Sequence, residues 1–405
     1  MNTNCLIRYQ QGSLEGFINN EDIARMKTLP YTESHLAFRS RLRQFLKSEV
    51  TPHVDQWEKD HMIPREIWRK MGRAGFLCTS VPEEYGGLGL DFLYSVIVNQ
   101  EMARTNHAGL MAYLHSDIVV PYILSYGLEV QKKKYLPGCI NGDIVTAVAM
   151  TEPDSGSDLA SMSTSAEEID GQVVINGNKT FISNGFHCDL VILAAKDPLV
   201  KSPHKAVSLY IVEDGTPGFK KGNLIEKMGM RSQDTAELFF NDCRIPKDNL
   251  LGQKGAGFVQ LMKKLQQERL LVAILAVSMA RNMLDWTVEC CRHALQNQEP
   301  MTKSQATRFA LVEMETELKV GTAFLNDLVM AHMENEDVTA ETSMAKYWCS
   351  EKANEVANRC LELVGRKSAS EDCPIVRMWR DVRIHTIFAG ANEIMKNIIA
   401  KSMKL

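Results

Sequence analysis

The sequence lacks the features that mark several specialised classes of protein. Its 405 residues include ten cysteines but no C-x-x-C pair, so a disulfide scaffold is not expected. The ten histidines form neither an H-E-x-x-H motif nor a cluster with ligand spacing, so we expect no metal site. The net charge of −4 argues against a partner that is nucleic acid, because such binding depends on Lys and Arg contacts to phosphate.

Long hydrophobic runs are also absent. A charge-free apolar run lies between Arg269 and Arg281 and spans residues 270–280. It is about half as long as the roughly 20 residues that a membrane span needs, so we expect a buried helix and no membrane span. The N-terminus has no charged segment followed by an apolar one, and no signal peptide is expected. With cysteines interpreted as reduced thiols, we expect a cytoplasmic protein.

What is present is an ordinary globular composition, with 45% hydrophobic and 24% charged residues. Its length favours two to three domains. A helical period begins at Ser34, where Phe38, Leu42, Phe45 and Leu46 form one stripe, and it returns after Pro246. We therefore predict an N-terminal arm (1–33), a helical domain (34–145), a middle β domain (146–250) and a C-terminal helical bundle (251–405).

The middle third has the short period of strands. Strand-like runs occupy residues 172–175, 179–183, 190–194, 207–212 and 236–240. The dipeptides at 170–171, 176–177 and 214–215 are Asp-Gly, Asn-Gly and Asp-Gly, which favour the tight turns of hairpins. Because no helices separate these runs, they predict a compact antiparallel β domain.

One glutamate lies on an apolar helical face. Successive steps of four and three residues place six side chains on one stripe: Leu261, Leu265, Glu268, Val272, Leu275 and Met279. A buried carboxylate has a raised pKa and is a candidate general base. From the stripe alone the commoner explanation is a glutamate paired to Arg269 or Arg281, or one that reaches water at the helix edge.

A second feature is the run of small polar residues from Met150 to Asp158. Its N–H groups and hydroxyls suit the polar edge of a cofactor ring or a phosphate, although the residues alone favour a solvent loop. The glycines between Gly252 and Gly257 match no phosphate-binding motif and predict a plain turn before the Glu268 helix.

Taken together, these segments resemble the flavin-dependent acyl-CoA dehydrogenase family, and its long-chain and isovaleryl branches in particular. The resemblance begins near residue 34 and covers nearly the whole remaining chain. It rests on motifs in family order: Val81–Gly87 (VPEEYGG), Ala149–Asp158 (AMTEPDSGSD), Phe181–Gly185 (FISNG), Met228–Ala236 (MGMRSQDTA), Leu265–Leu270 (LQQERL) and Phe388–Met395 (FAGANEIM). The resemblance implies an α+β multidomain fold, with a helical N-terminal domain, a middle β domain and a C-terminal four-helix bundle.

The resemblance also implies a chemistry. In the family a glutamate removes the α-proton of an acyl thioester, a hydride passes from the β-carbon to FAD, and a 2-enoyl thioester forms. Most members carry that glutamate where this chain has Ala389, whereas the long-chain and isovaleryl branches carry it on the helix of Glu268. Both lines of argument therefore select Glu268 as the catalytic base.

By motif match, further residues belong to the implied site. Those at the substrate are Ser157, Arg269 and Gly390, whose neighbourhood supplies a backbone N–H to the thioester oxygen. Those at the cofactor are Met150, Thr151, Gly156, Ser157, Phe181, Ile182, Ser183, Gln305, Asn392 and Glu393.

The chain departs from the family where a neighbouring subunit contacts the flavin. The Arg-x-x-Phe-Gly segment of the family reads Ala294, Asn297 and Gln298, a glutamine further on survives as Gln305, and Glu362 and Ala391 stand at two other altered places. Losing an arginine near a pyrophosphate weakens binding. These changes leave two hypotheses open: an enzyme with modified FAD binding, or a non-redox thioester-binding or scaffolding protein that lost flavin.

The partners implied by the resemblance are an acyl-CoA or acyl-carrier-protein substrate, an electron-transfer flavoprotein, and further copies of the chain in a homodimer or homotetramer. The acyl chain length is not predicted.

Overall fold

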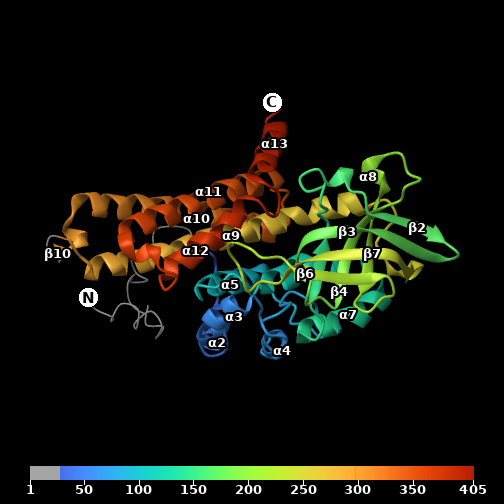
Figure 1. Cartoon of the computed structure of the whole chain (residues 1–405), viewed down its shortest axis with the longest axis horizontal. Coiled ribbons are helices and arrows are strands. Elements are labelled where there is room, and N and C mark those ends of the chain that lie inside the picture. Colours follow the sequence, from blue (N-terminus) through green and yellow to red (C-terminus); the bar gives the residue numbers. More distant parts are fainter. Residues whose placement is uncertain (1–27, 297) are drawn as a thin grey trace.

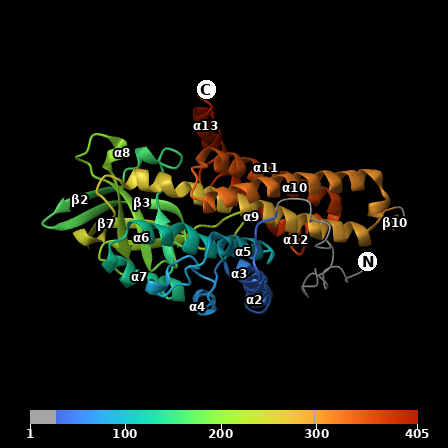
Figure 2. The same ribbon diagram turned by 180° about the vertical axis from the view of Figure 1, so that it is seen from behind.

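The expected α–β–α organisation is present in the computed structural model, which describes residues 28–296 and 298–405. Residues 1–27, most of the expected N-terminal arm, and Asn297 lie outside the described residues. Figure 1 shows the β domain at one end of the long axis and the paired long helices of the C-terminal domain at the other. The N-terminal helices lie below both, and Figure 2 shows the same arrangement from behind.

The N-terminal domain is built from amphipathic helices packed around one buried helix, α5. In α2, three of the four residues of the predicted stripe, Phe38, Leu42 and Leu46, are buried, and Phe45 is partly buried against the same core. Helix α5 is buried nearly all round, and the Asp91 carboxylate caps it by accepting the Leu93 N–H at 2.9 Å. The helices and helical turns of this domain are α2 (Glu33–Glu49), η1 (Thr51–His53), α3 (Val54–Asp60), α4 (Arg65–Arg73), η2 (Glu83–Tyr85), α5 (Phe92–Ala103), the π-helical turn η3 (Leu114–Val119), α6 (Val120–Tyr126) and α7 (Glu129–Asn141).

The middle domain is one 8-stranded sheet, ordered β6-β7-β3-β2-β4-β5-β8, with β1 beside β4. All but two of its pairings are antiparallel, as expected; β1 and a single residue pair of β2 run parallel to β4. The elements are β1 (Thr146–Ala149), η4 (Leu159–Ser161), β2 (Ser165–Ile169), β3 (Gln172–Ser183), β4 (Leu190–Lys196), α8 (Pro203–Ala206), β5 (Val207–Glu213), β6 (Phe219–Leu224), β7 (Thr235–Pro246), η5 (Lys247–Asn249) and β8 (Leu250–Leu251).

Two of the predicted hairpins are wrong. The turn at Asp214-Gly215 lies between β5 and β6, which do not pair with each other, since β5 pairs with β4 and β8 and β6 pairs with β7. Residues 172–175 and 179–183 are not two strands joined by a turn at Asn176-Gly177; they are one strand, β3. On both sides of the dipeptide β3 pairs with β7, as Ile175 does with Cys243 and Gly177 with Phe240. The Asn-Gly dipeptide therefore forms a bulge, with φ +145° at Gly177, because the partner strand continues past it.

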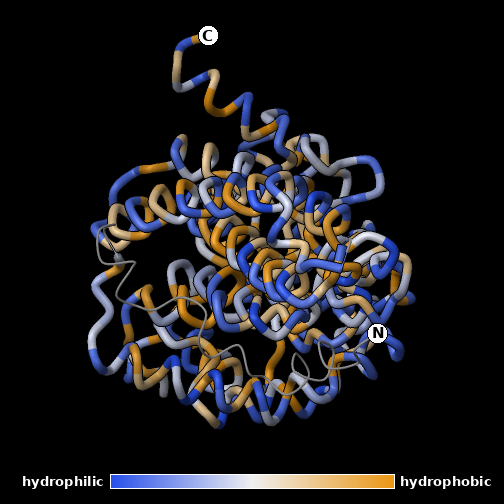
Figure 3. The backbone as a smooth tube through the Cα atoms, turned by 90° about the vertical axis from the view of Figure 1, so that its left-hand side faces the viewer, coloured by the Kyte–Doolittle hydropathy of each residue, from blue (hydrophilic) through white to orange (hydrophobic). Residues whose placement is uncertain are grey.

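Helix α9 (Gly257–His293) connects the β domain to the bundle. Every residue from Glu268 to Val277 is buried, so this stretch serves as core between the N-terminal helices and the bundle. By length and composition it is the one described helix that passes the test for a membrane span, but 78% of its most apolar window is buried inside the fold, as in a core helix. Figure 3 shows hydrophobic and hydrophilic residues alternating along the helical turns of the backbone, as amphipathic packing requires.

The C-terminal domain completes the bundle around α9. Its remaining elements are β9 (Leu295–Gln296), β10 (Glu299–Pro300), η6 (Met301–Lys303), α10 (Gln305–Met333), α11 (Thr339–Val364), η7 (Gly365–Ala369), α12 (Pro374–Val382), η8 (Arg383–Thr386) and α13 (Asn392–Ser402). Helix α13 projects from the body of the molecule, with the chain end at its tip (Figure 1). The short turn between η8 and α13 therefore lies where the projecting helix meets the bundle.

Candidate active site

Glu268 is buried in the middle of α9, as its stripe predicts. Only 4% of its surface is exposed, and all five apolar members of the stripe are buried with it. The Tyr122 hydroxyl donates a hydrogen bond to Oε1 of Glu268 at 3.2 Å. Burial raises the pKa of Glu268 to about 7, although the Tyr122 hydrogen bond and the Arg269 charge each lower it.

Neither ordinary explanation for such a glutamate holds here. Among the described residues no cation lies within ion-pair distance of Glu268, and Arg281 is paired with Asp285 and Glu315 instead. The side chain does not reach bulk water either. A carboxyl whose pKa lies near neutrality can exchange a proton with a bound molecule, which is the property that a general base needs.

Side-chain contacts to α9 fix the position of Glu268 against the N-terminal domain. The Gln267 amide donates to the backbone oxygen of Asp117 in η3 at 2.5 Å, and the Asn99 amide donates to the backbone oxygen of Leu271 at 3.0 Å. Tyr122 follows on α6, directly after η3. The same contacts that hold α9 in register therefore bring the tyrosine to the glutamate.

On its other side, the Glu268 region faces α11. Arg269, which is also buried, donates to the Ser343 hydroxyl at 3.3 Å. Lys346 lies one helical turn further along α11 and is wholly buried; its ammonium donates to the Gly390 carbonyl at 2.6 Å and to Oδ1 of Asn392 at 3.0 Å. Burial, reinforced by the Arg269 charge, lowers the pKa of Lys346 to about 7.

The turn between η8 and α13 has an unusual backbone. Ala389 and Gly390 have φ angles of +53° and +93°, and a Cβ on Gly390 would meet Cε of Met395 at 2.6 Å. Within the described part of the chain, no acceptor contacts the N–H groups of Ala389, Gly390 or Ala391. Consecutive N–H groups without partners at a helix start suit a carbonyl oxygen or an anion.

In the β domain, the run from Met150 to Asp158 is a structured turn and not a free loop. Lys179, which is wholly buried, donates to Oε1 of Glu152 at 2.8 Å and to the Met150 carbonyl at 3.0 Å. Burial alone raises the pKa of Glu152, but the Lys179 charge and nearby hydrogen bonds lower it to about 2, so the carboxylate stays ionised. Burial lowers the pKa of Lys179 to about 8, although the Glu152 charge and hydrogen bond act to raise it.

This turn lies against the end of β3. The Thr180 N–H donates to the Thr151 carbonyl at 2.9 Å, which brings Phe181 beside the turn. Phe181 has φ +55° and is 64% exposed, an unusual state for a phenyl ring next to ordered structure. The structure thus brings together Met150, Thr151, Phe181 and Ser183, with Gly156 and Ser157 exposed at the turn.

These residues fit the ring of a flavin. An exposed phenyl ring offers an apolar surface for an aromatic ring system to cover, and the hydroxyls of Thr151, Ser157 and Ser183 offer hydrogen bonds to its polar edge. Ile182 differs from its neighbours, since its side chain is buried in the core of the sheet and leaves only its backbone for a cofactor.

Three predicted residues lie elsewhere. The Asn392 amide is occupied within the protein by Lys346, Ser350 and Glu351, so it serves the fold. Glu393 is exposed and lines a cavity of about 590 Å³ with Arg383 and Trp379. Gln305, the first residue of α10, is exposed at the β10 end of the bundle, opposite the β domain in Figures 1 and 2, so one chain does not bring it to the other residues.

Sequence reasoning missed Tyr122, Lys346 and the Glu152–Lys179 pair. A signal existed for Lys346, because it shares a helical face with Thr342, Cys349, Ala353 and Cys360, all of them buried. This is the same pattern of one charge among uncharged, buried neighbours that identified Glu268. No pattern in the sequence pointed to Tyr122. Among the described residues, no group of three His, Cys, Asp or Glu side chains is arranged to hold a metal ion.

Comparison with protein-family models gives three matches along the chain. Models described as the N-terminal, middle and C-terminal domains of acyl-CoA dehydrogenase match residues 32–143, 147–243 and 255–404. Together they cover nearly all of the described chain, in the order that the sequence motifs imply.

Individual relatives and solved structures indicate the same family as the domain models. The chain is 40% identical to the mitochondrial long-chain specific acyl-CoA dehydrogenase of Mus musculus, over 92% of this chain and 87% of that protein. It is 31% identical to the mitochondrial isovaleryl-CoA dehydrogenase of Oryza sativa, over 93% of this chain and 92% of that protein. A crystal structure of an acyl-CoA dehydrogenase from Geobacillus kaustophilus superposes with a TM-score of 0.92 at 46% identity, over 93% and 100%. The structure of a prolyl acyl carrier protein oxidase superposes with a TM-score of 0.85 at 27% sequence identity. The match covers 93% of this chain and 100% of that protein.

Proposed function

This chain belongs to the acyl-CoA dehydrogenase family, and from that membership and the site geometry we propose that Glu268 is its catalytic base. The protein is a flavin-dependent oxidoreductase that dehydrogenates acyl thioesters between the α and β carbons. The observation that carries the proposal is the burial of the Glu268 carboxyl, without an ion-pair partner and with its pKa raised to about 7.

The reaction needs the α-proton of a weakly acidic thioester to be removed. Ionised Glu268 takes this proton, and its affinity for protons is high because the site excludes water. The backbone N–H groups near Gly390 bind the thioester oxygen, which gains negative charge as the α-proton leaves. Bound FAD supplies the acceptor for the hydride that leaves the β-carbon.

The cofactor is held, in this proposal, by the β domain of the same chain. Met150, Thr151, Ser157 and Ser183 would hold the polar edge of the flavin ring, and Phe181 would offer its ring to the flavin's apolar surface. The support is the exposed Phe181 ring fixed beside a turn that the Glu152–Lys179 pair anchors. Glu393, which lines the cavity near α13, would contact the distal part of the cofactor.

We propose an acyl-CoA or an acyl carrier protein as the thioester substrate and an electron-transfer flavoprotein as the electron acceptor. A carrier-protein substrate is supported by the likeness to the prolyl acyl carrier protein oxidase. Rates with the same acyl group on coenzyme A and on a carrier protein decide between the two. Hydrogen peroxide formation in air, in place of electron-transfer flavoprotein reduction, would contradict the proposed acceptor.

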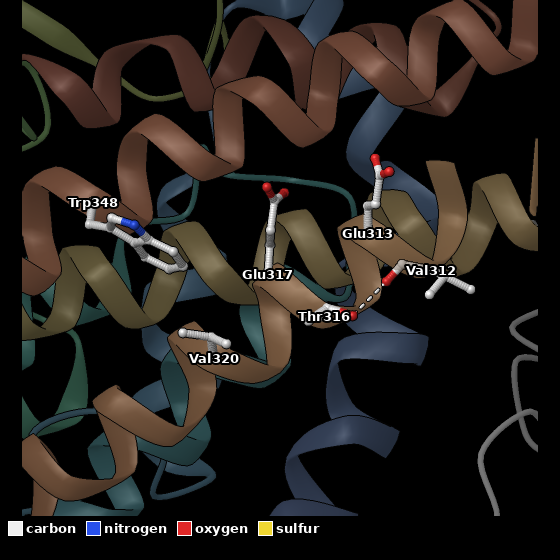
Figure 4. A pocket seen from close by; sticks show the side chains of 6 residues that line it. All are labelled: Val312, Glu313, Thr316, Glu317, Val320 and Trp348. Atoms are coloured by element: carbon white, nitrogen blue, oxygen red, sulfur yellow. Dashed lines mark hydrogen bonds between the residues drawn. The ribbon is translucent and has the colours of Figure 1, made fainter. Parts of the chain in front are cut away.

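The bundle surface supports a homo-oligomer. Helix α10 presents Phe309, Val312 and Val320, each more than half exposed. Val312 and Val320, together with Trp348 of α11, line a surface hollow of about 370 Å³, shown in Figure 4. Exposed apolar side chains in a row are characteristic of protein interfaces, and we propose that a second copy of the chain covers them.

A reducing, cytoplasmic location is also proposed. Apart from Cys290, every cysteine that the structure describes is buried and forms no disulfide, which suits a compartment where thiols stay reduced. Cell fractionation tests this directly.

The deciding experiment on the base uses purified protein without oxygen. The wild-type protein should be yellow and should lose its flavin absorbance when a series of straight and branched acyl-CoAs is added. Glu268→Gln should retain the flavin and its colour after the same additions. A colourless protein that cannot be reconstituted with FAD would contradict flavin dependence, and bleaching of Glu268→Gln would contradict the base assignment.

A further inference from the structure

Lys346 is a buried cation without a counter-charge in contact. Its ammonium touches only neutral oxygens, those of Gly390 and Asn392, and among the described residues no carboxylate lies within ion-pair distance of it. Burying an ammonium on neutral partners costs free energy that a leucine or methionine at this position would not cost. A buried lysine amine kept at such a cost indicates a task, and its contacts point to the turn that precedes α13.

The contact between Lys346 and Gly390 determines where the turn presents its donors. In a planar trans peptide the carbonyl and the following N–H point in opposite directions. Because the Gly390 carbonyl points at Lys346, the N–H of Ala391 points away from α11. With this carbonyl bonded to Lys346, Ala389 and Gly390 have left-handed conformations, and in the described part of the chain the N–H groups of the turn have no acceptor.

No other described side chain offers the turn a comparable anchor. His385 lies beneath it with its ring stacked on Phe388 at a centroid distance of 5.4 Å, but neither of its ring nitrogens has a hydrogen-bond partner among the described residues. Asn392, at the start of α13, is itself bonded to Lys346 and Ser350. Lys346 thus holds both ends of the segment from Gly390 to Asn392.

We propose that Lys346 is a positioning residue, whose ammonium orients the turn at Gly390 so that its backbone N–H groups bind the carbonyl oxygen of the thioester. This inference rests on the proposed function, in which that turn binds the thioester oxygen. In this proposal Lys346 acts through the backbone that it holds, since its ammonium already donates to the Gly390 carbonyl and to Asn392.

The test separates carbonyl binding from general damage by comparing two ligands. One is an acyl-CoA, and the other is the matching S-alkyl-CoA thioether, which has a methylene in place of the carbonyl. Both affinities are measured by titration calorimetry in the Glu268→Gln background, where the thioester is not consumed. The thioester should bind more tightly than the thioether to this parent protein.

Adding Lys346→Met should weaken thioester binding about tenfold, because the N–H groups that bind the carbonyl oxygen are no longer held in place. Thioether binding should stay within about twofold of the parent protein's. Ser350→Ala is the matched control, since Ser350 contacts Asn392 from the same helix but does not touch Gly390. It should leave the preference for the thioester unchanged.

Two outcomes overturn the proposal: Lys346→Met weakens both ligands equally, or it retains the parent preference. If Lys346→Met does not fold, Lys346→Gln, which keeps a shorter donor, should show an intermediate loss, and an unchanged preference there would also overturn it. A parent protein that shows no thioester preference at all would contradict the proposed binding mode of the carbonyl. Turnover by the parent would contradict Glu268 as the base and leave the role of Lys346 intact.

Discussion

The hydroxyl of Tyr122 donates a hydrogen bond to Glu268, and both side chains are almost wholly withdrawn from solvent. Burial and this hydrogen bond shift the pKa of the Glu268 carboxyl in opposite directions. Burial raises the pKa of Glu268, whereas the hydrogen bond stabilises the ionised form and lowers it. Tyr122 therefore limits how far burial can raise the pKa of the proposed base, and this balance leads to the first prediction.

Replacing Tyr122 with Phe should move the pH dependence of catalysis upward. A base acts when it is ionised, so kcat/KM of the wild-type enzyme should rise with pH through about 7, the pKa of Glu268. Removing a hydrogen bond to a charged group, about 1.5–3 kcal/mol, raises that pKa by roughly one unit or more. Tyr126→Phe is the control, because Tyr126 contacts Gln260 and not Glu268. Identical profiles for the wild type and Tyr122→Phe would contradict this role.

The same carboxyl predicts a pH-dependent stability. The pKa of Glu268 is higher in the folded state than in the unfolded chain, so the unfolded chain releases its proton first as the pH rises. Stability is therefore lost between about pH 4.5 and 7. Glu268→Gln removes this loss, and its advantage over the wild type should be roughly 3 kcal/mol larger at pH 8 than at pH 4.

Urea unfolding of both proteins across this pH range provides the measurement. A difference in stability that stays constant with pH would mean that Glu268 titrates normally in the folded protein. It would also remove the main physical argument for a base with a raised pKa.

The sequence allowed the α–β–α organisation to be predicted because each period persists over many residues. It failed at Asn176-Gly177, where a local turn preference is overridden by β7, a strand more than 50 residues away in the chain. Glu268 was recognisable as one charge on an apolar face, yet Tyr122 was not, since its role depends on a contact between residues 146 positions apart. Sequence reasoning also left a non-redox protein open, and the family membership favours the dehydrogenase.

The buried Glu152–Lys179 pair should anchor the flavin-facing turn. Glu152→Gln leaves the Lys179 ammonium buried without its counter-charge, which typically costs 3–5 kcal/mol. We expect a lower melting temperature and less bound flavin per chain. The double variant Glu152→Gln/Lys179→Met should recover much of the stability, because no unpaired charge remains. Flavin content that stays at the wild-type level in the single variant would contradict the anchoring role.

The apolar row on α10 should hold the oligomer together. Val320 is 56% exposed in the single chain, so Val320→Asp should leave the fold intact while placing a charge in the proposed interface. Light scattering after size-exclusion chromatography should show a smaller species than for the wild type. Val130→Asp makes the same change at a valine on α7 that is 67% exposed and lies away from α10, and its mass should not change. Equal masses for all three proteins would contradict the interface.

Phe181 offers the most direct test of the cofactor site, because its exposure separates binding from folding. A ring that is 64% exposed contributes little to the stability of the protein without cofactor, so Phe181→Ala should unfold at nearly the wild-type temperature once flavin is removed. If the flavin covers this ring, the variant loses that contact, and the dissociation constant for FAD should rise about tenfold. Phe186→Ala, at a nearby phenylalanine that is 43% exposed, should bind FAD as the wild type does. Unchanged FAD affinity in Phe181→Ala would place the flavin ring away from the end of β3, since an aromatic contact of this size cannot be removed without loss.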